Sequence, residues 1–136
     1  MSMVVDTCVL LDILDAHPDF SLSSALALNR YSSFGLVIAP ITYVELAPAF
    51  NGDRDLQNQF LNGLGITLPE TVEYEVLAEA HATWYNHILR KRTCKVAKRP
   101  IADVMIGALA SVNDGLITRN AKDFRILFPR LNIVVP

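Results

Sequence analysis

The stretch Val4-Val5-Asp6-Thr7-Cys8-Val9-Leu10-Leu11 decides the fold of this chain. A short, β-branched apolar run ends on a carboxylate, and a helix-like apolar segment follows at once. A strand that is buried on both faces has such a continuous hydrophobic sequence. Open α/β sheets bind their ligands at the carboxyl ends of parallel strands. Asp6 is therefore either a ligand-binding residue or a simple cap of the next helix.

The rest of the chain alternates between strand-like and helix-like segments in the same way. Short apolar runs predict strands at residues 3–6, 36–39, 66–68, 116–118 and 132–135. Helical spacing predicts helices at residues 9–15, 18–31, 43–50, 56–62, 70–91, 101–112 and 121–128. This alternation predicts an α/β fold with a parallel sheet and helices on both faces.

Two details of the helices are also predicted from the sequence. Pro48 falls inside the segment 43–50 and indicates a kink or an early end. In the longest helix, apolar residues at helical spacing indicate the buried face. These residues are Leu77, Ala80, Trp84 and Ile88.

Length and composition indicate one globular domain over residues 1–136, with 51% hydrophobic and 19% charged residues. The sequence contains no apolar stretch long enough to span a membrane and no basic leader before the first strand. These features predict a cytoplasmic protein without a membrane association. In such a compartment Cys8 and Cys94 are expected to be reduced.

The net charge of −2 argues weakly against nucleic-acid binding, but the distribution of the charges is uneven. Half of the 12 basic residues lie in the segment 90–99. Phosphate contacts depend on such local positive charge, so Lys95, Lys98 and Arg99 are candidate RNA contacts. A solvated helix end followed by a loop explains the same segment equally well.

Three more carboxylates lie at the edges of apolar elements, as Asp6 does: Glu45, Asp103 and Asp123. Four carboxylates that meet in one cleft repel one another unless a cation is present. Oxygen ligands suit hard cations such as Mg²⁺ or Mn²⁺, and no His/Cys set has the spacing of a zinc site. The sequence therefore predicts a divalent metal site.

Four segments, in this order, resemble the motifs of PIN-domain nucleases, and together they span nearly the whole chain. The first is the stretch that begins at Val4, and the second is Ile41-Thr42-Tyr43-Val44-Glu45-Leu46. The third is Pro100-Ile101-Ala102-Asp103-Val104-Met105-Ile106-Gly107-Ala108-Leu109-Ala110. The fourth is Leu116-Ile117-Thr118-Arg119-Asn120-Ala121-Lys122-Asp123-Phe124. The order, the spacing and the chain length resemble those of a compact VapC-type toxin.

This resemblance implies a three-layer α/β/α fold with a central parallel sheet of about five strands. It implies Mg²⁺- or Mn²⁺-dependent cleavage of RNA, inhibition by a cognate antitoxin protein, and a homodimer. Asp6, Glu45 and Asp103 match the acidic core and are implied as metal ligands and catalytic residues. Thr7 and Thr118 are implied to support the site.

The fourth motif leaves alternatives open. Many members of the family carry Asp where Asn120 stands, and Asp123 follows one turn later. We expect Asp123 to be the fourth catalytic carboxylate and metal ligand, and Asn120 to be a neutral ligand or an orienting group. Arg119 is expected to pair with a carboxylate of the site, to contact RNA or to form a plain surface ion pair. Asp12 and Asp15 on the first helix are expected to face solvent, with a position of Asp12 near the cleft as the alternative.

Other functions fit the sequence less well. A phosphatase with a strand-end nucleophile needs a second Asp two residues later, where this chain has Cys8. A phospho-acceptor receiver domain needs a paired acidic cluster and a late lysine that the sequence does not provide. A nuclease acting on DNA or flap structures is usually larger. The main alternative is a catalytically inactive PIN-like module that binds RNA or protein.

Overall fold

The computed structural model describes residues 1–93 and 101–136, with side chains described at 1–89 and 101–136. Its five strands are β1 (Met3–Val5), β2 (Leu36–Val37), β3 (Ile66–Thr67), β4 (Gly115–Ile117) and β5 (Ile133–Val134). The helices are α1 (Thr7–Leu14), α2 (Ser21–Tyr31), α3 (Pro40–Glu45), α4 (Arg54–Gly63), α5 (Tyr74–Thr93), α6 (Ile101–Ser111) and α7 (Ala121–Leu127). Two short 3₁₀ segments lie at Ser32–Phe34 and Ala47–Phe50. The candidate RNA contacts Lys95, Lys98 and Arg99 lie outside the described residues.

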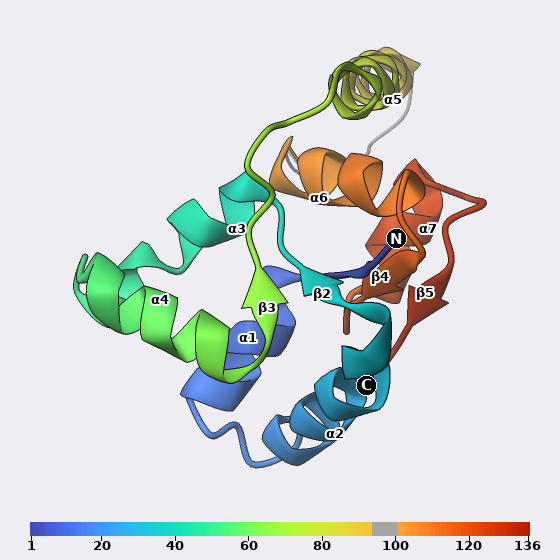
Figure 1. Ribbon diagram of the computed structural model, residues 1–136. Helices are drawn as coiled ribbons and strands as arrows, with labels where there is room; N and C mark the ends of the chain where they lie inside the picture. The colour runs from blue at the N-terminus through green and yellow to red at the C-terminus, as the bar shows by residue number, and fades with distance from the viewer. Residues whose placement is uncertain (94–100) are drawn as a thin grey trace.

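All five strands are parallel and form one sheet in the order β3-β2-β1-β4-β5 (Figure 1). The chain first builds outward from β1 to β2 and β3, and it then returns to the other side of β1 for β4 and β5. In register, Val5 of β1 pairs with Ile117 of β4. The strand order therefore reverses between β1 and β4, and the carboxyl ends of these two strands border the crevice at which such sheets bind ligands.

The helices cover the two faces of the sheet and give three layers (Figure 1). On one face, α1, α2 and α4 bury a core that includes Val5, Leu10 and Ile117. On the other face, α5, α6 and α7 bury a second core that includes Val4 and Phe124. Adjacent residues of β1 thus point to opposite cores, which explains why its sequence is apolar without interruption. The predicted α/β/α fold with a five-stranded parallel sheet is confirmed.

The prediction about Pro48 is also confirmed. The helix expected at residues 43–50 ends at Glu45 as α3, and a separate 3₁₀ segment, Ala47–Phe50, follows it. Proline has no backbone N–H and cannot continue the hydrogen-bond ladder of an α-helix. This break leaves Glu45 at the last turn of α3, near the carboxyl edge of the sheet.

The buried face of α5 differs from the prediction in one respect. Ala80 is buried as expected, but the Leu77 side chain is 48% exposed. Val76, Thr83 and His87 are buried beside Ala80 instead, at a spacing of four, three and four residues. Thr83 and His87 are polar, so a prediction from hydropathy does not include them. The predicted buried face of α5 therefore lies about one residue away from the observed one.

The packing of α6 depends on a glycine. A Cβ atom on Gly107 would lie 2.2 Å from Cε2 of the buried Phe128. Gly107→Ala is therefore expected to lower the free energy of unfolding by about 1–3 kcal/mol, because overpacking forces the ring or the helix to shift. Urea denaturation followed by circular dichroism measures this change.

Gly63→Ala is the matched control for this prediction. Gly63 ends α4 with no atom within 4 Å of the added Cβ, and alanine is the better helix former. This variant should be as stable as the wild type or more stable. Equal stabilities of the two alanine variants would contradict the described packing of α6 against Phe128.

Candidate active site

Asp6 stands at the carboxyl end of β1, where its main chain already leaves the strand. Its backbone N–H donates to the carbonyl of Ile117 at 3.0 Å, which ties it to the end of β4. Asp6 is the N-cap residue of α1, yet its carboxylate forms no capping bond with that helix. The alternative that Asp6 is only a helix cap is therefore wrong.

The Asp6 carboxylate is instead held by side chains. The Thr118 hydroxyl donates to Asp6 Oδ2 at 2.6 Å, and the Cys8 thiol donates to the same oxygen at 3.3 Å. Thr118 is fully buried and its oxygen also accepts the backbone N–H of Asn120 at 2.9 Å. These bonds fix the orientation of a carboxylate that is only 6% exposed.

Glu45 is held by a second hydroxyl, that of Thr7. Thr7 Oγ1 donates to Glu45 Oε1 at 2.7 Å and lies 3.0 Å from Thr42 Oγ1. Thr7 begins α1 directly after Asp6, so one helix N-terminus orients carboxylates from two elements. Thr42 was not among the residues predicted for the site, although its position three residues before Glu45 places both on one side of a helix.

Asp103 lies in the first turn of α6, and the charges of the other three carboxylates act on it. Partial burial and, in decreasing order, the negative charges of Asp6, Asp123 and Glu45 together raise the pKa of Asp103 from 3.8 to about 6. All three predicted partners are thus close enough to act on one carboxyl group. Glu45 and Asp123 are themselves exposed.

The chemistry of this donor set suits a hard divalent cation. The four acidic side chains offer only oxygen ligands, and among the described side chains no Lys or Arg forms an ion pair with any of them. As they stand, no three described His, Cys, Asp or Glu side chains share a ready-made metal geometry. Mutual repulsion of like charges keeps carboxylates apart, and a cation removes that repulsion.

Cys8 contributes as a thiol. Burial and, to a smaller extent, the nearby Asp6 charge raise the pKa of Cys8 to about 11. At neutral pH the side chain therefore stays protonated and donates to Asp6. A nucleophile or soft metal ligand needs the thiolate, so Cys8 is neither here.

Asp12 corrects one prediction, because it does not face solvent. It is 4% exposed and accepts two bonds from Arg119, at 2.5 Å from Nε and 2.8 Å from Nη2. The Arg119 guanidinium also lies 4.2 Å from the centroid of the Phe20 ring. Arg119 therefore joins the loop after Thr118 to α1 and α2. The exposed Asp15 agrees with the prediction.

The three-layer fold and the carboxylates at its switch point define a class of α/β proteins with an acidic site at the carboxyl edge of the sheet. The family model of the PIN domain matches residues 3–127 of this chain. The chain therefore belongs to the PIN domain family.

A solved structure shows the same fold. A chain of the crystal structure of VapBC2 from Rickettsia felis bound to a DNA fragment from their promoter superposes with a TM-score of 0.67. The two chains are 16% identical, and the alignment covers 99% of this chain and 98% of that chain. At this identity the similarity establishes the fold. No curated protein matches this sequence.

The raised pKa of Asp103 predicts how stability depends on pH. Between pH 3.8 and about 6 the folded state binds more protons than the unfolded state, so its stability falls as the pH rises. Asp103→Asn has no carboxyl proton to lose, so the stability of this variant should fall less as the pH rises. In EDTA at pH 7.5 its melting temperature should exceed that of the wild type.

Thermal melts from pH 4 to 7.5 test this prediction, with Asp15→Asn as the control because Asp15 is an exposed carboxylate of α1's C-terminal cap. The control should follow the pH dependence of the wild type. A wild-type stability that rises steadily over this interval, with Asp103→Asn unchanged in melting temperature, would contradict the described coupling.

Proposed function

We propose that the protein is a metal-dependent endoribonuclease and the toxin of a toxin–antitoxin pair. The observation that carries this proposal is the coupling of Asp103 to Asp6, Glu45 and Asp123 at the switch point of the sheet. Membership of the PIN domain family supports it, because PIN domains are generally nucleases. RNA as the substrate and Mg²⁺ or Mn²⁺ as the cofactor are the finer parts of the proposal.

In this proposal Asp6, Glu45 and Asp103 hold the cation, directly or through water, and Asp123 is the outer acidic ligand. When bound, a divalent cation activates a water molecule and offsets the charge that develops on the phosphate. The hydroxyls of Thr118 and Thr7 keep Asp6 and Glu45 oriented toward it.

The attacking group in this proposal is water. The thiol of Cys8 is protonated, and the three histidines come from other elements than the four carboxylates: His17 follows α1, while His81 and His87 are on α5. Asn120 donates its backbone N–H to Thr118, which supports its role as an orienting residue, with Asp123 as the fourth carboxylate. Asp103 must lose its proton to bind a cation, so activity should rise with pH through about 6.

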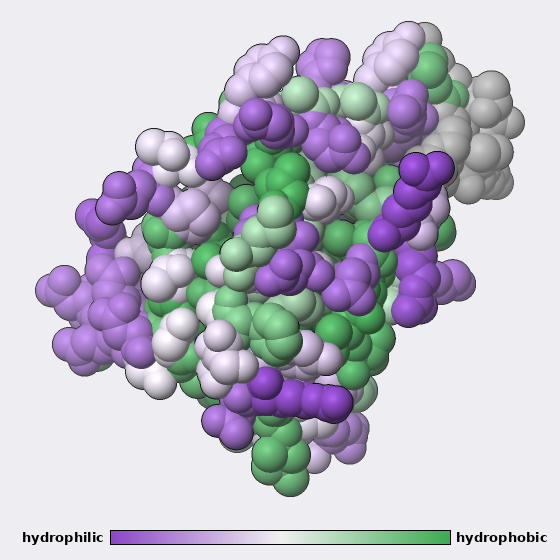
Figure 2. All heavy atoms as spheres, turned by 45° about the vertical axis from the view of Figure 1, so that its right-hand side comes forward, coloured by the Kyte–Doolittle hydropathy of each residue, from purple (hydrophilic) through white to green (hydrophobic). Residues whose placement is uncertain are grey.

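The proposed partner is a small antitoxin protein. The similar chain from Rickettsia felis was solved as VapBC2, and this chain exposes apolar side chains on α2 and α4 that an antitoxin segment could cover. Leu22 and Leu26 of α2 are 72% and 59% exposed, and Leu56 of α4 is 52% exposed. Figure 2 shows hydrophobic atoms at the lower tip of the molecule, where α2 lies in Figure 1.

A homodimer and a cytoplasmic location remain predictions. None of the helices in the described residues could span a membrane.

Cleavage of a mixed small-RNA pool tests the proposed activity. Purified protein with Mg²⁺ or Mn²⁺ should give discrete fragments, and EDTA should abolish them. Asp6→Asn and Asp103→Asn should each lower the rate by about 100-fold or more, because they remove direct ligands. Asp15→Asn should cut as the wild type does.

Two results would oppose the proposal. Folded wild-type protein that cuts no RNA under any of these metals would favour the inactive module that binds RNA or protein. Fragments that persist unchanged in both site variants would show that the cleavage does not come from this site.

A further inference from the structure

A groove with a mixed polar and apolar lining lies between α3, α4 and β3, outside the carboxylate cluster. Its volume is about 490 Å³, which is within the usual range for small-molecule sites. Its polar side chains are Thr67 of β3 and four residues of the two helices, Tyr43, Arg54, Asn58 and Asn62. Buried Ile66 forms part of its apolar floor. We call this feature the α3–α4 groove.

One end of the α3–α4 groove reaches the edge of the sheet at which the carboxylates lie. This end is marked by Leu68, which follows the carboxyl end of β3, and the groove extends from there along α4 to Asn62. All strands are parallel, so the end of β3 and the end of β1 with Asp6 share one edge. Tyr43 and Glu45 are two residues apart on α3 and leave the helix on different sides, so a linear ligand would have to pass around α3 to reach from the carboxylates into the groove.

The walls of the groove are held in place by hydrogen bonds. The Tyr43 hydroxyl donates to Asn58 Oδ1 at 2.7 Å, and the buried Gln57 donates through Nε2 to the Tyr43 carbonyl at 2.7 Å. Asp53 caps α4 by accepting from two backbone N–H groups at 3.1 and 3.2 Å. The groove is thus formed before any ligand binds, which lowers the entropic cost of binding.

The charge of the groove fits a polyanion. Arg54 is its cation, fully exposed at the first turn of α4, and no carboxylate is among its lining residues. Asp53 and Asp55 flank Arg54 in sequence without lining the groove, although the Asp55 charge acts on Arg54. Phosphate binding depends on such local positive charge even in a protein of net charge −2.

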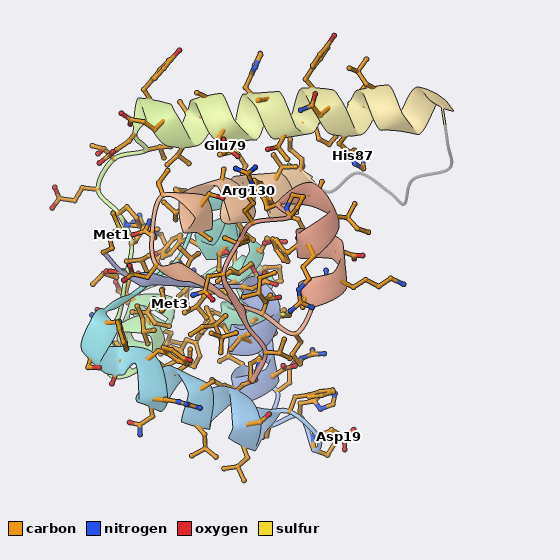
Figure 3. All side chains as sticks on the ribbon, turned by 90° about the vertical axis from the view of Figure 1, so that its right-hand side faces the viewer. Met1, Met3, Asp19, Glu79, His87 and Arg130 are labelled. Atoms are coloured by element: carbon orange, nitrogen blue, oxygen red, sulfur yellow. The ribbon has the colours of Figure 1, made fainter. Side chains whose placement is uncertain are left out.

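A cavity at the opposite edge of the sheet provides a contrast. It lies beside Gly115 at the start of β4, and its volume is about 440 Å³. It also contains an arginine, Arg130, but the carboxylates of Glu79 and Asp114 line it as well. Figure 3 shows Glu79 on the inner side of α5 and Arg130 below it. This cavity lacks both the position and the charge that a bound RNA strand would need.

From these observations we infer that the α3–α4 groove binds an unpaired nucleotide of the substrate RNA that flanks the scissile phosphate. Single-stranded RNA is recognised through exposed base edges, base stacking and phosphate contacts. Side-chain amides of Asn58 and Asn62 offer donors and acceptors to a base edge, and Tyr43 offers an aromatic ring. Arg54 pairs with the phosphate. The inference rests on the proposed ribonuclease function and adds a place where sequence preference arises.

The test compares groove variants with wild type in cleavage and in binding. Arg54→Gln should raise KM for the cleaved RNA about 3–10-fold with little change in kcat, because Arg54 binds substrate without touching the reacting atoms. Asn62→Ala should change the relative yields of the fragments from the RNA pool. Arg130→Gln is the matched control, since it removes an exposed arginine at the other edge.

Binding is measured without cleavage, by fluorescence anisotropy of a short labelled single-stranded RNA of mixed sequence in EDTA. Arg54→Gln should bind about 3–10-fold more weakly, and its salt slope should be smaller by about 0.7, the value for one lost phosphate contact on a single strand. Arg130→Gln should retain the wild-type slope. Melting temperatures confirm that each variant is folded.

The two readouts separate this inference from the proposed function. If the wild type cuts RNA and both groove variants keep its KM, fragment yields and salt slope, the groove is not an RNA subsite, while the ribonuclease stands. If the wild type cuts nothing, the nuclease proposal fails. In that case, weaker RNA binding by Arg54→Gln but not by Arg130→Gln would still support the groove as an RNA-binding site. Unchanged RNA binding by Arg54→Gln would overturn this inference.

Discussion

The hydrogen bond from Thr118 to Asp6 is the contact on which the site depends. It joins the ends of β1 and β4, the two strands between which the order of the sheet reverses. The two oxygens are 2.6 Å apart, Thr118 is fully buried and Asp6 is nearly so. Without it, the Asp6 carboxylate would be free to cap α1, the role that its position predicts most simply. Thr118 also accepts the N–H of Asn120, so the same hydroxyl fixes the loop that leads to Asp123. A single buried side chain thereby places an acidic residue from the start of the chain and another from near its end.

The second constraint is electrostatic. Asp6, Glu45, Asp103 and Asp123 come from four different elements, and the pKa of Asp103 is raised to about 6 by its burial and by the other three. The fold therefore accepts an unfavourable concentration of negative charge at one edge of the sheet. The cation that the chain does provide nearby, Arg119, is already committed to Asp12. Among the described side chains no cation forms an ion pair with the four carboxylates, although the Arg119 charge acts on Asp6 from its place beside Asp12. Such a concentration of like charge is typical of functional sites.

Much of the fold and of the acidic site could be predicted from the sequence, because they depend on the spacing of the apolar residues and on the order of the strands and helices along the chain. Uninterrupted apolar runs at β1 and β4 report burial on both faces, and the carboxylates that end them or begin the next helices mark one edge of the sheet. What could not be predicted depends on pairing across long separations. Asp12 reads as a solvent-facing acid on α1 until Arg119, 107 residues later, is placed beside it. The buried Thr83 and His87 likewise hide the true face of α5, because a hydropathy pattern cannot recognise a buried polar residue.

Binding of Mn²⁺, measured by electron paramagnetic resonance at pH 7.5, tests the central claim that the four carboxylates form a divalent metal site. The wild type should bind Mn²⁺, and Asp6→Asn and Asp103→Asn should each weaken binding at least about 10-fold. Asp19→Asn, which changes an exposed carboxylate between α1 and α2, should bind as the wild type does. Equal Mn²⁺ binding by the wild type and both site variants, or no binding by the folded wild type, would contradict the account.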